Sequence, residues 1–207
     1  MSAKSSDARA DPVCSGGQGA LAEAFMGHRA RLRRMVDLRL DRRVAGRVDA
    51  SDVLQDAFVD ASRQFDRYLA DPPMPLFLWL RLITGQRLMA IHRRHLGAKK
   101  RDAKQEVAFR RYAPEADSHS LSCGLAGRLT SPSRAVIRQE MESRLHEAIS
   151  ALDPLDREIL ALRHYEELTN LEAAQELDIT PAAASKRYIR ALERLKAALG
   201  QLPSPLA

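Results

Sequence analysis

The sequence has little cysteine and no long apolar run, and both shortages exclude classes of protein. Its two cysteines, Cys14 and Cys123, are far apart and lack CxxC spacing. We therefore expect neither a disulfide framework nor a cysteine zinc site. No apolar stretch reaches the length of about 18 residues that a membrane span needs, and residues 1–19 lack the apolar core of a signal peptide. The expected location is the cytoplasm.

Strand patterns are also missing. Aromatic residues make up only 5% of the chain, and alternating runs of Val, Ile and Thr do not occur. Helix-forming residues dominate instead. With 207 residues, 45% of them hydrophobic, the chain is large enough for one or two small cores. The predicted fold class is all-α.

Two stretches without apolar periodicity divide the chain. Residues 1–19 are predicted to be disordered, and residues 113–137 mix Gly, Ser and Pro and are predicted to be a flexible linker. These segments leave two small helical domains, at 20–112 and 138–200, followed by a short tail at 201–207.

Positive charge exceeds negative charge in the sequence. It has 33 Lys and Arg against 27 Asp and Glu, a formal net charge of +6. This balance favours an anionic partner, either nucleic acid or an acidic membrane surface. Charge alone does not choose between them.

The segment AAQELDITPAAASKRYIRALERL, residues 173–195, has the pattern of two helices joined by a tight turn. Thr180 is a suitable cap, and Pro181 takes the first position of the second helix. Asp178 stands in the turn where glycine is commoner, but Asp tolerates the left-handed conformation. The pattern predicts a helix-turn-helix, and a basic second helix is typical of DNA recognition.

Helical spacing assigns two faces to this second helix. The core stripe is predicted to contain Ala184, Tyr188, Ala191 and Leu195. The opposite face holds Ala182, Ala183, Lys186 and Arg190, with Arg187 at its edge. Small leading residues admit a helix into a major groove, and the later cations reach bases or phosphates. For an isolated helix the alternative is a solvated face of good helix formers.

Charge is segregated within the N-terminal domain. Residues 49–71 contain six acidic and two basic residues, whereas residues 79–101 contain seven basic and no acidic ones. Asp52, Asp56 and Asp60 recur every four residues, and such like-charged neighbours repel. A basic protein partner would explain this stripe, and a solvated face balanced by Arg63 and Arg67 is the alternative.

Phe77 and Trp79 begin the basic segment, just after the loop ADPPMP. Aromatic rings at such a place can stack on an unpaired base, although a single Trp is more often part of a core. His92 and His95 have the i,i+3 spacing of metal ligands, but the neighbouring Arg93 and Arg94 would repel a cation. We expect no metal and no other cofactor.

These segments, taken in order, resemble the bacterial RNA polymerase sigma factors of the sigma-70 family, of the extracytoplasmic-function (ECF) type. DASDVLQDAFVDA (49–61) is similar to region 2.2, and FLWLRLITGQRLMAIHRR (77–94) is similar to regions 2.3 and 2.4. The stretch from Leu152 to Leu199 resembles region 4 almost from end to end. The joint order of the motifs is more specific than any one of them.

The resemblance implies a non-enzymatic initiation subunit that binds core RNA polymerase, through its two largest subunits, and promoter DNA. An anti-sigma factor is a further partner that the family implies, and no membrane contact is expected. The implied site residues fall into three groups. Those for core polymerase are Asp52, Gln55, Asp56 and Asp60. Those for the −10 element are Phe77, Trp79, Arg81, Gln86, Arg87, His92, Arg93 and Arg94. Those for the −35 element are Ala182, Ala183, Ser185, Lys186, Arg187, Ile189 and Arg190.

Two other classes remain as alternatives. A conventional helix-turn-helix regulator would bind duplex DNA without polymerase, but it gives the acidic stripe no role. An enzyme acting on nucleic acid would need clustered carboxylates beside His or a Gly-rich phosphate loop, and the sequence has neither.

Overall fold

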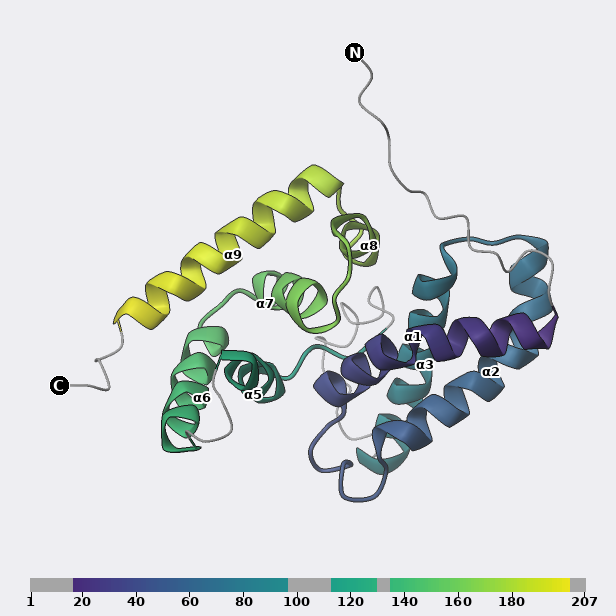
Figure 1. The fold of residues 1–207 in the computed structure, drawn as a ribbon, viewed down its shortest axis with the longest axis horizontal. Helices are drawn as coiled ribbons and strands as arrows, with labels where there is room; N and C mark the ends of the chain where they lie inside the picture. Colours follow the sequence, from purple (N-terminus) through teal and green to yellow (C-terminus); the bar gives the residue numbers. More distant parts are fainter. Residues whose placement is uncertain (1–16, 97–112, 130–134, 202–207) are drawn as a thin grey trace, which may run out of the picture.

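The computed structural model describes residues 17–96, 113–129 and 135–201, and within these ranges the regular structure is helical throughout. The prediction of an all-α fold is confirmed. Figure 1 shows two groups of helices, one at each end of the molecule. None of the helices in the described ranges combines the length and the apolar composition that a membrane crossing requires.

The first group, which we call the N-terminal half, contains α1 (Gln18–Arg39), α2 (Ala50–Ala70) and α3 (Leu76–Leu96). Helix α2 begins with a capping box: the Asp49 carboxylate accepts from the backbone N–H of Asp52, and the Asp52 carboxylate accepts from that of Asp49. On α2 the side chains of Leu54, Ala61 and Phe65 are buried, and their helical spacing places them on one face. These side chains hold the three helices around one core.

The second group, the C-terminal half, contains α6 (Ala135–Ser150), α7 (Pro154–Leu160), the π-helical turn η2 (Ala161–Tyr165), α8 (Asn170–Glu176) and α9 (Pro181–Gln201). Asp153 caps α7 through the N–H of Leu155, and Pro154 occupies its first position. Helix α7 thus begins at Pro154, directly after its cap residue Asp153. Leu145 and Ile149 of α6 and Ile159 of α7 are buried.

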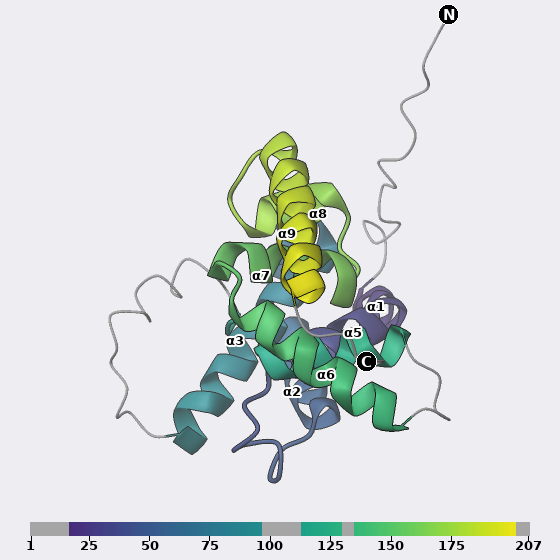
Figure 2. The ribbon, with the colours of Figure 1, turned by 90° about the vertical axis from the view of Figure 1, so that its left-hand side faces the viewer.

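The segment 113–137 differs from the expected linker because it contains helix α5 (Ser118–Leu129) and the first residues of α6. Figures 1 and 2 show α5 lying along α6. Leu121 and Ala126 are fully buried, and the Asp117 carboxylate accepts from Ser120 at the helix start. Packing against neighbours thus overrides the weak helix propensity of the Ser and Gly residues.

The other predicted boundaries fall partly outside the described residues. The expected disordered segment 1–19 is described only from Gly17, and α1 begins at Gln18. The basic run at 99–101, Cys14 and the tail from residue 202 lie outside the described residues.

Gly124 in α5 lies so close to Tyr165 of η2 that no side chain fits there. A Cβ atom on Gly124 would lie 2.0 Å from Cε2 of Tyr165. We expect Gly124→Ala to lower the free energy of unfolding by about 1–3 kcal/mol through overpacking. Gly27→Ala in α1 is the matched control, because nothing lies within 4 Å of its added Cβ and alanine is the better helix former. Urea unfolding of both variants measures the difference, and equal midpoints would contradict the contact.

Buried ion pairs join the two halves. Arg39 at the end of α1 and Arg81 of α3 both donate to the carboxylate of Glu166, which follows η2. Arg39 also donates to Glu158 of α7. The side chains of Arg39, Arg81 and Glu166 are each only 1% exposed. Charges removed from water to this extent persist only when they are paired and hydrogen-bonded.

The pairing controls the ionisation of Glu166. Burial alone would raise the pKa of its carboxyl group, but the charges and hydrogen bonds of Arg39 and Arg81 outweigh burial and lower the pKa from the usual 4.5 to about 2. Burial likewise lowers the pKa of Arg39, and the carboxylates of Glu158 and Glu166 more than reverse this, so the pKa of the guanidinium is raised. Glu166 is therefore ionised in the folded protein at neutral pH.

This depressed pKa predicts a dependence of stability on pH. Because the folded state holds Glu166 ionised, its contribution is complete above pH 4.5 and is lost as pH falls towards 2. Wild-type protein should exceed Glu166→Gln in free energy of unfolding by roughly 3 kcal/mol at pH 7. The difference should shrink below pH 4.5, because a protonated Glu resembles Gln. Urea titrations of both proteins between pH 7 and 2.5 measure it, and a constant difference would be the contrary result.

Candidate nucleic-acid interface

Helices α8 and α9 form the predicted helix-turn-helix. Thr169 and Glu172 make a capping box at the start of α8, and Asn170 donates from its side-chain amide to the carbonyl of Pro181. The turn closes through a hydrogen bond from the N–H of Ile179 to the carbonyl of Ala174. Asp178 has a φ of 54°, so the left-handed conformation expected of this residue is confirmed.

Helix α9 shows the two faces that its spacing predicts. Ala184 and Ala191 are fully buried, Leu195 is 8% exposed and Tyr188 is partly buried. The opposite face is exposed at six of the seven predicted −35 residues, which are Ala182, Ala183, Ser185, Lys186, Ile189 and Arg190. Ile189 is 54% exposed. An exposed apolar side chain among small and cationic ones suits the mixed edges of a major groove, where thymine presents a methyl group.

Arg187, the seventh predicted −35 residue, is only partly exposed because α7 holds it. Its Nη1 donates to the carboxylate of Asp156 at 2.9 Å and lies 3.7 Å from that of Asp153. Arg194 pairs with the same buried Asp156. The cation at position 187 therefore stabilises the packing of α9 on α7, which orients the exposed face.

The predicted −10 residues of α3 lie on different sides of the helix. Gln86, Arg93 and Arg94 are exposed, and seven residues separate Gln86 from Arg93, so these two share one face. Arg87 is partly buried and makes a two-nitrogen contact with the carboxylate of Asp60 on α2. Fewer of the basic residues of α3 are therefore exposed for DNA contact than the sequence predicts.

His92 is also directed into the N-terminal half. Its Nε2 accepts a hydrogen bond from the backbone N–H of Asp41 at 3.1 Å. Burial lowers the pKa of the imidazole, the Asp41 carboxylate opposes this shift, and Arg43 adds to it. The lowered pKa favours the neutral form of the ring, and its Nε2 is occupied as an acceptor within the N-terminal half.

Three predicted −10 residues, Phe77, Trp79 and Arg81, are buried in this structure. Trp79 is 6% exposed and stacks on Tyr68 with ring centroids 4.5 Å apart. Arg31 covers the ring of Phe77 at 3.6 Å from its centroid. Of the two sequence interpretations, the arrangement favours core residues over a free stacking platform for both rings. Arg81 is held by Glu166, as described above.

A cavity of about 320 Å³ lies beside the indole of Trp79, where α2 ends and α3 begins. Its walls come from the end of α2, the connecting loop and α3. The lining residues are Gln64, Arg67, Tyr68, Asp71, Pro73, Trp79 and Leu82. Aromatic walls with amide and charged groups can hold a flat polar ligand by stacking and hydrogen bonds.

The predicted polymerase-binding residues on α2 differ in their exposure and in their contacts within the protein. Gln55 and Asp56 are exposed, and the side chain of Asp56 is 53% exposed. Asp52 is exposed but is occupied by the capping box. Asp60 is paired with Arg87, so part of the like-charge repulsion expected along the stripe is relieved across the two helices. The exposed part of this stripe is therefore centred on Gln55 and Asp56, and the Asp56 carboxylate lies 3.7 Å from Nη1 of Arg87.

The sequence analysis missed the arginines of α1. Arg31 donates to Glu172 at 2.9 Å, and Arg34 donates to Glu167 at 2.6 Å, in both cases across the two halves. More than 130 residues separate the members of each pair. In a sequence, Arg and Glu on helices are normally interpreted as solvent-exposed residues. Their role in joining the halves follows only from the contact between distant segments.

Comparison with known proteins supports the reading of both halves. Residues 142–195 match the family model described as Sigma-70, region 4. The RNA polymerase sigma-H factor of Pseudomonas aeruginosa is 28% identical over 155 residues, which cover 74% of this chain and 75% of that protein.

Two solved structures are similar to this chain. CnrH, in complex with the cytosolic domain of CnrY, has a TM-score of 0.50 at 22% identity, covering 91% of this chain and 92% of that one. The sigma factor RpoE of Bartonella quintana, in complex with the anti-sigma factor NepR, has a TM-score of 0.48 at 16% identity, covering 88% of this chain and 97% of that one.

The order of motifs, the helix-turn-helix with its exposed face and the region 4 match agree with one another. Residues 142–195 are similar to region 4 of the sigma-70 family, and the chain as a whole resembles sigma factors of the extracytoplasmic-function type.

Proposed function

We propose that this sigma factor directs RNA polymerase to promoters by placing the exposed face of α9 in the major groove of the −35 element. The observation that carries this assignment is the continuous exposed face of small, apolar and cationic side chains on the second helix of a complete helix-turn-helix. Ala182 and Ala183 permit close approach of the helix. Lys186 and Arg190 lie one and two turns further along, where they reach base edges or phosphates.

The N-terminal half is assigned to the −10 element. Gln86, Arg93 and Arg94 supply an exposed polar and cationic face on α3 that fits a DNA backbone. The cavity beside Trp79 has walls suited to an unstacked base, because its lining combines the indole with the polar side chains of Gln64 and Arg67. Trp79 would then act as a fixed wall, because its ring is already stacked on Tyr68.

The exposed acidic surface of α2 around Gln55 and Asp56 is assigned to core RNA polymerase. Carboxylates at the surface attract a basic partner and orient its approach. This surface is separate from the exposed face of α9 in sequence and in the fold. The two tasks of the protein therefore fall on different residues.

Regulation and location follow from the same assignment. CnrH and the Bartonella RpoE were each solved with a protein partner, and NepR is an anti-sigma factor. We assign an anti-sigma partner to this protein as well, and the cytoplasm as its location, since it acts on polymerase and promoter DNA.

The test is run-off transcription with core RNA polymerase from the same source, a pool of genomic promoter fragments, and the purified full-length chain. New transcripts that start downstream of shared sequence elements are expected only when the chain is present. Stable binding to duplex DNA without polymerase, and no transcripts with it, would instead identify a conventional helix-turn-helix regulator.

A further inference from the structure

Asp156 of α7 is a buried residue whose carboxylate holds two arginines of the neighbouring helix α9. Only 4% of its side chain is exposed. Its Oδ1 accepts from Nη1 of Arg187 at 2.9 Å, and its Oδ2 accepts from Nη1 of Arg194. Seven residues separate the two arginines, so they lie on one side of α9 and about 10 Å apart along its axis. One carboxylate therefore fixes α9 on α7 at two points.

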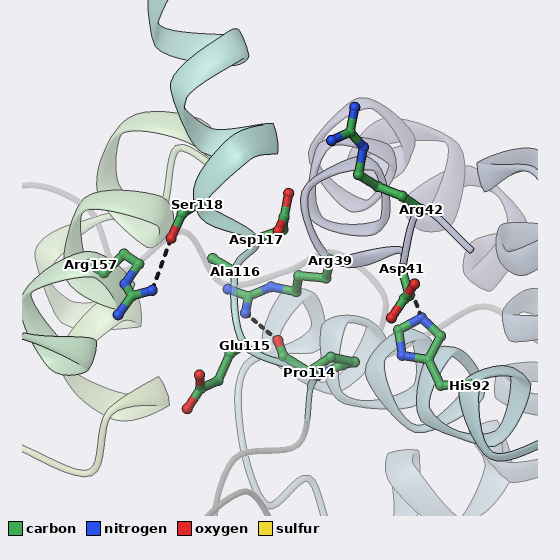
Figure 3. Close-up of a pocket in the computed structure, with 10 residues that line it drawn as sticks. All are labelled: Arg39, Asp41, Arg42, His92, Pro114, Glu115, Ala116, Asp117, Ser118 and Arg157. Carbon is green, nitrogen blue, oxygen red and sulfur yellow. Dashed lines mark hydrogen bonds between the residues drawn. The ribbon is translucent and has the colours of Figure 1, made fainter. Parts of the chain in front are cut away.

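Helix α7, which carries this carboxylate, is itself anchored to α5. Figure 3 shows Arg157, the residue after Asp156, donating to the hydroxyl of Ser118 at the start of α5, and the N–O distance is 2.9 Å. Ile159, one turn after Asp156, is fully buried. Asp156 is therefore a fixed acceptor, and the positions of the two arginines are set by it.

The two arginines stand at the edge of the α9 face that is assigned to the −35 element. At about 100° per residue, Arg194 lies about 40° and Arg187 about 60° around the helix from the exposed Arg190. Long cationic side chains at this edge can reach the phosphates that flank a major groove. The side chain of Arg187 is 35% exposed and that of Arg194 is 59% exposed. Either guanidinium can therefore turn to solvent or to DNA once Asp156 no longer holds it.

Phosphate contacts and base contacts affect specificity in opposite ways. A cation on a phosphate raises the affinity for every DNA sequence and carries no sequence information. Recognition depends on the ratio between the affinities for correct and incorrect sites, because a genome offers roughly a million or more competing sites. Removing a phosphate contact while keeping the base contacts therefore raises specificity.

We propose that Asp156 is a specificity-determining residue, which withholds Arg187 and Arg194 from the phosphate backbone and leaves −35 recognition to the exposed face of α9. This inference rests on the proposed function. The resemblance assigns Arg187 to the −35 element, whereas here Arg187 is a positioning residue that contacts protein. Asp156 acts through the two arginines and does not itself contact DNA.

The salt dependence of promoter binding tests the proposal. Holoenzyme is assembled from core RNA polymerase and the full-length chain, and it is titrated at several KCl concentrations with promoter fragments that carry an intact or a scrambled −35 element. Each phosphate contact adds about 0.9 to the slope of log affinity against log salt. Asp156→Asn keeps the shape and frees two cations, so its slope should be steeper by about 1–2. The ratio of the affinities for intact and scrambled fragments should fall about tenfold, because non-specific binding rises.

Two further variants separate withheld cations from a loss of structure. Arg187→Gln should have the wild-type slope, and the double variant Asp156→Asn/Arg187→Gln should have a slope about 1 lower than Asp156→Asn. Glu140→Gln is the matched control, because it also removes one negative charge, from a pair with Arg144 within α6, and should leave the slope unchanged. Circular dichroism checks that each variant keeps its helices, and Arg187→Gln alone decides the question if Asp156→Asn fails to fold.

A slope for Arg187→Gln about 0.9 below that of wild type would show that Arg187 already contacts a phosphate, and would overturn the proposal. So would an Asp156→Asn slope equal to that of Glu140→Gln, or weaker binding to both fragments without a steeper slope. These results concern Asp156 alone and leave the proposed function standing. Wild-type holoenzyme that binds intact and scrambled fragments equally would instead refute the proposed function, and this inference with it.

Discussion

Replacing Lys186 or Arg190 by Ala should remove most promoter-specific transcription while leaving core polymerase binding intact. Both side chains are exposed on the outward face of α9, so their loss costs the fold little. Each base contact that is lost weakens −35 binding by about 1–3 kcal/mol, which is roughly 5- to 150-fold. A phosphate contact would instead weaken binding to all sequences equally and reduce its salt dependence.

Lys196→Ala is the matched control for this experiment. It removes the same charge from an exposed position of the same helix, but ten residues after Lys186 and therefore on another face. Run-off transcription and anisotropy titrations of labelled promoter DNA with the assembled holoenzyme measure the effect. If Lys196→Ala reduces transcription as much as Lys186→Ala, the general charge of α9 matters and the assigned face is wrong.

The faces of α9 could be predicted because local rules agree there. Pro181 and Thr180 mark the start of the helix, and the spacing of Ala184, Ala191 and Leu195 gives the buried side without reference to any other element. Asp178 is compatible with a tight turn because Asp tolerates the left-handed conformation, which it adopts in the structure. The start of a helix, its apolar periodicity and the conformation of a turn all depend on residues that are close in sequence, so the sequence alone predicts them.

Helix α5 could not be predicted on the same basis. Its sequence, SHSLSCGLAGRL, is rich in Ser and Gly and shows no clear apolar stripe. Leu121 and Ala126 are buried only because α6 and its neighbours supply the other side of the contact. Gly124, which resembles a linker residue in the sequence, is required by the ring of Tyr165.

The ionic contact between the halves is hidden from sequence for a related reason. Arg39 and Glu166 are 127 positions apart, and each lies at the end of a helical segment where a charged residue normally faces water. Arg81 stands within a basic segment, which favoured a DNA contact for it. The pairing becomes visible only when the fold brings α1 against α3 and η2.

The acidic surface of α2 gives the second large expected effect, from the variant Asp56→Lys. Placing a cation where a basic partner binds costs several kcal/mol, so binding to core RNA polymerase should fall by about 100-fold or more. Asp56 is the better position for this reversal than Asp52, because Asp52 also accepts the capping hydrogen bond at the start of α2. A change at Asp52 would mix loss of binding with loss of helix stability.

Asp66→Lys provides the control, with the same reversal of charge on an exposed position of the same helix, ten residues away and on another face. Titration of core polymerase into fluorescently labelled protein measures both affinities, and −35 binding by the C-terminal half should be unaffected in either variant. Equal losses for Asp56→Lys and Asp66→Lys would show that net charge alone governs the affinity. A loss confined to Asp56→Lys would locate the contact at the Gln55–Asp56 surface. The variant also removes the 3.7 Å ion pair between Asp56 and Arg87, but the shorter pair between Asp60 and Arg87 still joins α2 to α3.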